Sequence, residues 1–292
     1  MKRKVLITKK TGKPTKLGDI LHRFFKNKAA VFGLILLLVI ICLACFADVI
    51  CPYKEAVRIH PRTRLLPPSK EHLFGTDDYG RDMLARVAHG AKYTLLIGVG
   101  CSATALIIGG FMGALCALSG GWIDSVFMRV ADAVATIPST LFAMVIVAAL
   151  GPNLQNLFIA LAIGNVPSFM RITKSSVLNI VDQDFVEASR ANGGGTIWIL
   201  LTHIIPNAIG TLIVYTTTAI SRLIISAAGL SYIGLGVQPP APEWGSMLSS
   251  CKEFFLTAPH LLIFPAIALL ISALGFNLVG DGLRDALDPK LK

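Results

Sequence analysis

The residue types that catalyse reactions or bind metals are scattered along this chain. Asp77, Asp78 and Asp82 lie close enough to suggest a calcium loop, but they lack the spacing and the closing glutamate of an EF-hand. Cys42 and Cys45 have CxxC spacing, yet no histidine or acid accompanies them. The six histidines are far apart, at His22, His60, His72, His89, His203 and His260. We therefore expect no catalytic residue, no metal site and no cofactor.

Motifs for nucleotide binding and hydrolysis are also missing from the sequence. No GxxxxGK[ST] loop occurs, because Gly12-Lys13 is followed by proline, so any ATP would have to be bound by another chain. Neither GxSxG nor HExxH occurs. An intramembrane enzyme that uses Asp281 and His203 stays open as an alternative, although no partner acid lies in a facing apolar run.

The composition indicates a membrane protein. Hydrophobic residues make up 54% of the 292 residues, charged residues make up 15%, and the mean hydropathy is +0.67. A soluble chain would carry about a quarter charged residues. The six cysteines include four in apolar runs, where cysteine acts as a small hydrophobe. Cys51 and Cys251 would share one outer face, but sequence alone does not pair them.

Uncharged runs of spanning length recur along the chain, and each is expected to be a helix because lipid offers backbone groups no other partner. Gly151-Pro152-Asn153 divides one long run into two, since these residues break helices and favour turns. The six predicted spans cover residues 29–47, 94–123, 133–150, 154–170, 206–232 and 259–279.

Charge sets the expected orientation of these spans. Ten lysines and arginines precede Ala29, against one acid, Asp19. A basic segment directly before an apolar run favours cytoplasmic anchoring and contact with lipid over binding of nucleic acid. Six spans then leave both termini cytoplasmic, together with the polar segment between the fourth and fifth spans.

That polar segment, residues 182–206, has the features of a helix that stands clear of the bilayer and then returns. Asp182 and Asp184 suit the positive N-terminal end of a helix. Gly193-Gly194-Gly195 would end this helix and allow a sharp turn. Pro206 is expected to start the next helix, where a missing N–H costs nothing.

Within this segment, the order of residues resembles the "EAA" loop of permease subunits in ATP-binding-cassette importers. Glu187-Ala188-Ser189 is followed by Gly193 at +6, His203 at +16 and Pro206 at +19. The resemblance implies a cytoplasmic helix that docks into a separate ATPase subunit. The residues that it assigns to this coupling are Glu187, Ala188, Ser189, Gly193, Trp198, His203 and Pro206.

Three further stretches resemble the dipeptide/oligopeptide branch of that family. They are residues 74–82 (FGTDDYGRD), 228–245 (AGLSYIGLGVQPPAPEWG) and 277–289 (NLVGDGLRDALDP). The chain departs from the branch at Ser189, which replaces an alanine, and at Ala227, where many relatives have glutamate. Residues 165–171 also lack the tryptophan and the Tyr-Ala-Arg that are common in relatives. These departures concern the substrate more than the fold.

The resemblance implies an all-α type I importer permease with six transmembrane helices. Its partners would be a second homologous permease, two ATPase subunits and an extracytoplasmic substrate-binding protein, in a bacterial cell membrane. The expected parts are a basic cytoplasmic tail (1–28), a first transmembrane helix (29–51), an extracytoplasmic segment (52–92), a permease domain (93–285) with the coupling segment 182–206, and a cytoplasmic C-terminal tail (286–292).

The cargo and the pore are less specified. Di- or oligopeptides are the expected cargo, with nickel or other metal chelates and haem as alternatives in the same machine. A passive channel is a further alternative that would need no coupling loop. Arg222, Ser226 and Ser231 are the candidate pore-lining residues. Arg222 either reaches the outer interface or lines the translocation path.

Overall fold

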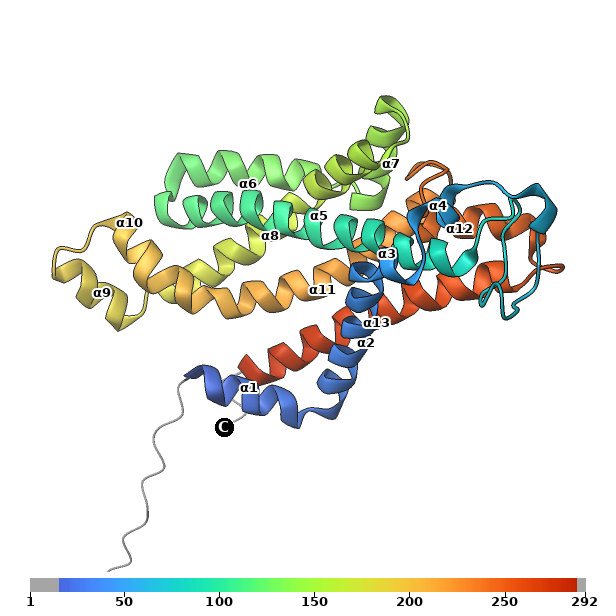
Figure 1. Cartoon of the computed structure of the whole chain (residues 1–292). Helices are drawn as coiled ribbons and strands as arrows, with labels where there is room; N and C mark the ends of the chain where they lie inside the picture. The colour runs from blue at the N-terminus through green and yellow to red at the C-terminus, as the bar shows by residue number, and fades with distance from the viewer. Residues whose placement is uncertain (1–15, 288–292) are drawn as a thin grey trace, which may run out of the picture.

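The computed structural model describes residues 16–287, whose regular elements are all helices. Five long helices pack into one elongated bundle (Figure 1): α2 (Lys28–Cys45), α5 (Met83–Ser119), α8 (Leu154–Val181), α11 (Ile205–Tyr232) and α13 (His260–Leu287). The shorter helices α1 (Lys16–Lys26), α6 (Gly121–Ala135) and α7 (Ser139–Leu150) lie beside them. Most of the predicted basic tail and residues 288–292 of the C-terminal tail lie outside the described residues.

The prediction of an all-α membrane protein is confirmed. Within residues 16–287, four helices are long and apolar enough to cross a membrane: α2, α5, the continuous helix Thr196–Tyr232, and α13. A fifth crossing exists if α6 and α7, which meet at a bend of 80°, form one broken span. The predicted fourth span falls in α8, whose second half carries Arg171 and Lys174. The number of six spans therefore stays a prediction.

The helices that the structure describes do not coincide with the predicted second and third spans. α5 begins at Met83, so the expected domain boundary at residue 93 cuts through a helix. It ends where Gly120 and Gly121 both adopt positive φ, at 57° and 53°, and the chain then turns back as α6. The spans were predicted from runs without charge. This criterion missed α6, because α6 carries acids that pair with cations of α8. Asp124 and Asp132 of α6 each lie 2.6 Å from a cation of α8, Lys174 and Arg171 respectively.

Small residues let the long helices approach closely, as is common between helices in membranes. A Cβ placed on Gly109 of α5 would lie 2.7 Å from the carbonyl oxygen of Val166 in α8. A Cβ placed on Gly33 of α2 would lie 2.5 Å from Leu278 of α13. Larger residues at these two glycines would force the helices apart.

The two ends of the bundle carry different short elements (Figure 1). At one end, the α9 end, lie α9 (Asp184–Ala191) and α10 (Thr196–Ile199). At the opposite end, the α12 end, gather α3 (Ala47–Ile50), α4 (Tyr53–Val57), the short helix η1 (Pro61–Thr63), and α12 (Trp244–Cys251), which η3 (Lys252–Phe254) follows. The segment predicted to couple and the stretches around residues 74–82 and 228–245 therefore lie at opposite ends.

Candidate coupling site

The first half of segment 182–206 folds as α9 and then reverses. Asp184 and Glu187 occupy the first turn of α9, where the helix dipole favours negative charge. Gly193 follows with φ of +82°, a conformation that side chains other than glycine rarely adopt. The N–H of Gly194 donates to the carbonyl of Ser189 at 3.0 Å and closes the turn. The expectation that glycines end this helix agrees with the structure.

The second half of the segment returns to the bundle without a break. The helix starts at Thr196, passes through a π-helical turn at Leu200–Ile204 (labelled η2), and continues as α11. Pro206 is the second residue of α11, so it does not start a helix from a loop as the sequence suggested. Since proline has no N–H and its ring crowds the preceding turn, a widened turn just before it accommodates the ring.

A groove of about 640 Å³ opens between α9 and the returning helix. The rings of Trp198 and His203 meet edge to face at 5.1 Å, and those of Phe185 and His203 at 6.1 Å. Trp198 stays 53% exposed and Phe185 40% exposed. The lining residues are Phe185, Ala188, Ser189, Asn192, Gly193, Gly194, Gly195, Trp198 and His203. An exposed aromatic groove of this kind suits insertion of a side chain or helix from another protein.

The groove includes five of the seven predicted coupling residues. Glu187 is exposed in the first turn of α9 and Pro206 is exposed in α11, and neither lines it. Asn192 is a lining residue that sequence reasoning missed. Its amide nitrogen donates to the carbonyl of Ala188 at 2.9 Å and caps α9, which its place just before the glycines could have indicated.

Three buried aliphatic residues hold the segment to the bundle, and sequence reasoning did not single them out. Val186, Ile199 and Ile204 are at most 2% exposed and pack with Val177 of α8 and Ala208 of α11. These residues alternate with exposed aromatic and polar ones at helical spacing. Each half of the segment thus buries one face in the bundle and presents the other as the groove.

The three candidate pore residues differ in how far they are exposed. The guanidinium of Arg222 lies 5.4 Å from the ring centre of Tyr215, seven residues earlier on α11. The side chain is exposed and points back along its helix, away from the α12 end. Ser226 is partly buried. Ser231 is 3% exposed, next to the carboxylate of Glu243, and presents no surface to a pathway in this structure.

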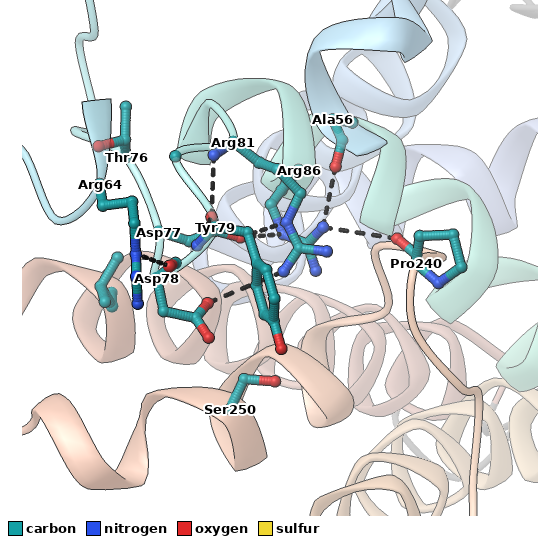
Figure 2. A network of polar contacts seen from close by, with 12 residues as sticks. Ala56, Arg64, Thr76, Asp77, Asp78, Tyr79, Arg81, Arg86, Pro240 and Ser250 are labelled. Atoms are coloured by element: carbon teal, nitrogen blue, oxygen red, sulfur yellow. Dashed lines mark hydrogen bonds and ion pairs between the residues drawn. The ribbon is translucent and has the colours of Figure 1, made fainter. Parts of the chain in front are cut away.

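At the α12 end, buried charges form the cap network around Asp77 (Figure 2). Its carboxylate accepts from Nε of Arg81 at 2.6 Å and lies 3.3 Å from Nε of Arg86. It also accepts the backbone N–H groups of Tyr79 and Arg81, each at 2.9 Å. Arg86 donates onward to the carbonyls of Ala56, at 2.8 Å, and Pro240, at 3.5 Å. Asp77, Arg81 and Arg86 are each at most 4% exposed.

The cap network argues against a calcium site at these aspartates. Because arginine and amide donors occupy both carboxylate oxygens of Asp77, those oxygens are not free to ligate calcium. Asp82 instead caps α5, accepting from the N–H of Ala85 at 2.9 Å.

Cys51 and Cys251 are both free thiols, so the structure does not pair them.

Loop 233–243 and α12 close over the cap network through two buried side chains. Glu243 accepts the N–H groups of Gly245 and Ser246 at 2.8 and 2.9 Å and caps α12. Burial raises the pKa of Glu243, and these hydrogen bonds offset part of the shift. The indole N–H of Trp244 donates to the carbonyl of Val87 at 3.0 Å, which ties α12 to α5. These hydrogen bonds therefore fix α12 against α5 at this end of the bundle.

The fold resembles that of one chain of a solved transporter. It matches a chain of the MetNI methionine ABC transporter, solved in inward-facing conformations, with a TM-score of 0.58. The sequences are 20% identical, and the match covers 70% of this chain and 98% of that one. At that identity the likeness shows the fold alone.

Family and relatives agree with this class. Residues 105–292 match the family described as binding-protein-dependent transport system inner membrane component, and residues 15–68 match the N-terminal TM domain of oligopeptide transport permease C. The chain belongs to this family of transport permeases and, like its members, is a multi-pass membrane protein rather than a catalytic enzyme.

Several curated relatives cover nearly the whole chain. The dipeptide transport system permease protein DppC of Alkalihalophilus pseudofirmus is 43% identical over 91% of this chain and 88% of its own length. The di/tripeptide transport system permease protein DppC of Pseudomonas aeruginosa is 41% identical over 96% and 94%. The glutathione transport system permease protein GsiD of Escherichia coli is 40% identical over 93% and 89%.

Proposed function

We propose that this chain forms half of the translocation pore of an ATP-driven importer and that segment 182–206 couples it to ATPase subunits. The observation that carries the proposal is the exposed aromatic groove, built from residues at the spacing of the coupling motif. The chain has no nucleotide-binding loop of its own, so the energy of ATP must arrive through contact with another chain.

The proposed assembly contains a second homologous permease, two ATPase subunits and an extracytoplasmic binding protein. Both termini would lie in the cytoplasm with the α9 end, after six crossings in which α6 with α7 is the third and α8 the fourth. In support, α1 and the end of α13 meet on one side of the bundle, where Asn27 donates to Asp285 at 3.1 Å.

Short peptides are the proposed cargo. The printed names of the relatives specify dipeptides, di/tripeptides and glutathione. Within the proposed pore, Arg222 is the residue that would meet a peptide carboxylate, because it is exposed and turned toward the middle of α11 by Tyr215. Ser226 would lie on the same path.

Neighbouring residues of α10 provide a matched test of coupling. Trp198 lines the groove, whereas Ile197, 74% exposed, does not. We expect Trp198→Ala to lower ATPase copurification from membranes and peptide uptake by about tenfold or more, as for an aromatic anchor at an interface. Ile197→Ala should leave both near the unchanged level. The coupling role would be refuted if Trp198→Ala and Ile197→Ala copurified equal amounts of ATPase, or if the unchanged protein copurified none.

A further inference from the structure

Two hollows of opposite character adjoin on α5 at the α12 end of the bundle. The first has a volume of about 300 Å³ and is lined by Asp48, Tyr53, His89, Lys92, Tyr93 and Leu96. The second has a volume of about 340 Å³ and is lined by Leu96, Leu154, Gln155, Phe158 and Ile159. Because Leu96 lines both, the polar hollow and the apolar hollow lie next to each other. This arrangement fits an amphiphile.

The polar hollow offers one charge of each sign and two phenols. Nζ of Lys92 lies 2.5 Å from a carboxylate oxygen of Asp48, and the hydroxyls of Tyr53 and Tyr93 are 3.4 Å apart. The side chains of Lys92 and Asp48 are 41% and 64% exposed. An ion pair this exposed contributes little to stability, so either partner can turn to a ligand at small cost. The hydrogen bond from Lys92 also lowers the pKa of Asp48.

The hollows lie where the polar and apolar parts of the chain meet. Lys92 is the last charged residue before the uncharged run 94–123, and Leu96 stands one turn further into that run. Phe46 and Val49, on either side of α3's start, are 56% and 81% exposed. Tyrosines are typical of the membrane–water boundary. The polar hollow is thus at headgroup depth and the apolar hollow at acyl-chain depth.

We propose that these hollows bind one phospholipid, from the leaflet at the α12 end, whose headgroup carries both a phosphate and a primary ammonium. The phosphate accepts from Lys92 and the tyrosine hydroxyls, and the ammonium donates to Asp48. One acyl chain lies along Leu96 and Phe158. Since Lys92 and Asp48 sum to zero charge, the site favours a zwitterionic headgroup over an anionic one.

A transported peptide fits these hollows poorly. A peptide backbone in the second hollow would lose its hydrogen bonds to water and find Gln155 as the single polar side chain there. An acyl chain has no such loss. The lipid site does not depend on the cargo or on the coupling groove, so it stands apart from the proposed function.

Native mass spectrometry of the full-length protein tests the site directly. The protein, purified with its associated subunits, is supplied with phosphatidylethanolamine or phosphatidylglycerol and then stripped of loosely bound lipid. We expect one retained phosphatidylethanolamine per chain and weaker retention of phosphatidylglycerol. Lys92→Gln and Asp48→Asn should each weaken phosphatidylethanolamine retention about fivefold, the effect of losing one exposed ion pair with the headgroup. Leu96→Trp, which fills the junction, should abolish it.

Matched variants separate the site from general effects. Lys54→Gln removes an exposed charge at the same end, outside both hollows, and should retain the lipid. Leu270→Trp enlarges a 63% exposed residue of α13 and should also retain it. The proposal is overturned if the unchanged protein retains no lipid, if phosphatidylglycerol is preferred, if the hollow variants match these controls, or if a dipeptide displaces the lipid.

Discussion

The α9 end and the α12 end of this bundle differ in what they bury and what they expose. At the α12 end, Asp77, Arg81 and Arg86 are buried and paired with one another and with backbone groups. At the α9 end, Trp198 and Phe185 stay exposed around an open groove. The cap network is thus paired within the chain, whereas the groove at the α9 end exposes apolar surface that no other part of residues 16–287 covers.

The difference has an energetic meaning. A buried ionic network is costly to disrupt, because each group that loses its partner keeps its desolvation penalty. The apolar surface of an exposed groove contributes favourable free energy only when a partner covers it. We infer that substitutions at the α12 end act first on folding stability, whereas substitutions at the α9 end act first on transport.

The largest effect on stability is expected for Asp77→Ala. Removing this carboxylate leaves two buried guanidinium groups without their shared partner, which costs about 3–5 kcal/mol. The thermal unfolding temperature of the purified protein in lipid nanodiscs should fall clearly. Glu71→Ala, which removes an exposed acid from the same segment, is the control and should change the temperature little. Equal temperatures for the two variants would mean that the cap network does not stabilise the fold.

At the α9 end, the second prediction is a loss of transport without a loss of stability. Gly193→Val places a branched side chain at a φ of +82°, which costs about 1–2 kcal/mol locally. Because a Cβ there would meet open space, the bundle itself should stay folded. We expect peptide uptake to be lost while the unfolding temperature stays near that of the unchanged protein.

Asparagine tolerates positive φ better than valine, so Gly193→Asn is the matched variant. It should retain most of the uptake that Gly193→Val loses. If both variants transport normally, the turn geometry does not matter for coupling. If both unfold, the α9 end is as structural as the α12 end and the contrast between them is wrong.

Sequence reasoning recovered the α9 end better than it recovered the bundle. The turn at Gly193 and the surface around Trp198 follow from local chemistry, since glycine, proline and spacing specify a reversal. The helix α6 was missed because its acids pair with α8, and such pairing depends on which helices become neighbours. The cap network was missed for the same reason, because Arg86 reaches the carbonyls of Ala56 and Pro240 only after long-range packing.

The third prediction concerns pH at the α12 end. Burial raises the pKa of Glu243 above its ordinary value of 4.5, so the folded protein holds this proton to a higher pH than the unfolded chain. The resulting stabilisation is fully present below pH 4.5 and is lost as the pH rises through the raised pKa. The stability of the unchanged protein relative to Glu243→Gln should therefore fall with rising pH.

Unfolding temperatures of the two proteins, measured in steps from acidic to neutral pH, check this. At neutral pH Glu243→Gln should lie within about 1 kcal/mol of the unchanged protein, because it keeps one acceptor for the cap of α12. Glu253→Gln, at an exposed position nearby, should show no pH-dependent difference of this kind. A difference that grows with pH would show that Glu243 is ionised when folded and stabilised by its hydrogen bonds.

The smallest effects are expected for the ion pairs between α6 and α8, toward the α9 end. Both pairs are 2.6 Å long, but the side chains of Asp132 and Arg171 are 60% and 48% exposed, whereas those of Asp124 and Lys174 are 26% and 21% exposed. Solvent screens the more exposed pair more strongly, so Asp132→Asn should cost less than Asp124→Asn, and both less than about 1 kcal/mol. Unfolding temperatures at low and high salt measure this order, and the loss in Asp124→Asn should depend less on salt. A loss as large as that of Asp77→Ala would mean that charge at this end is as structural as in the cap network.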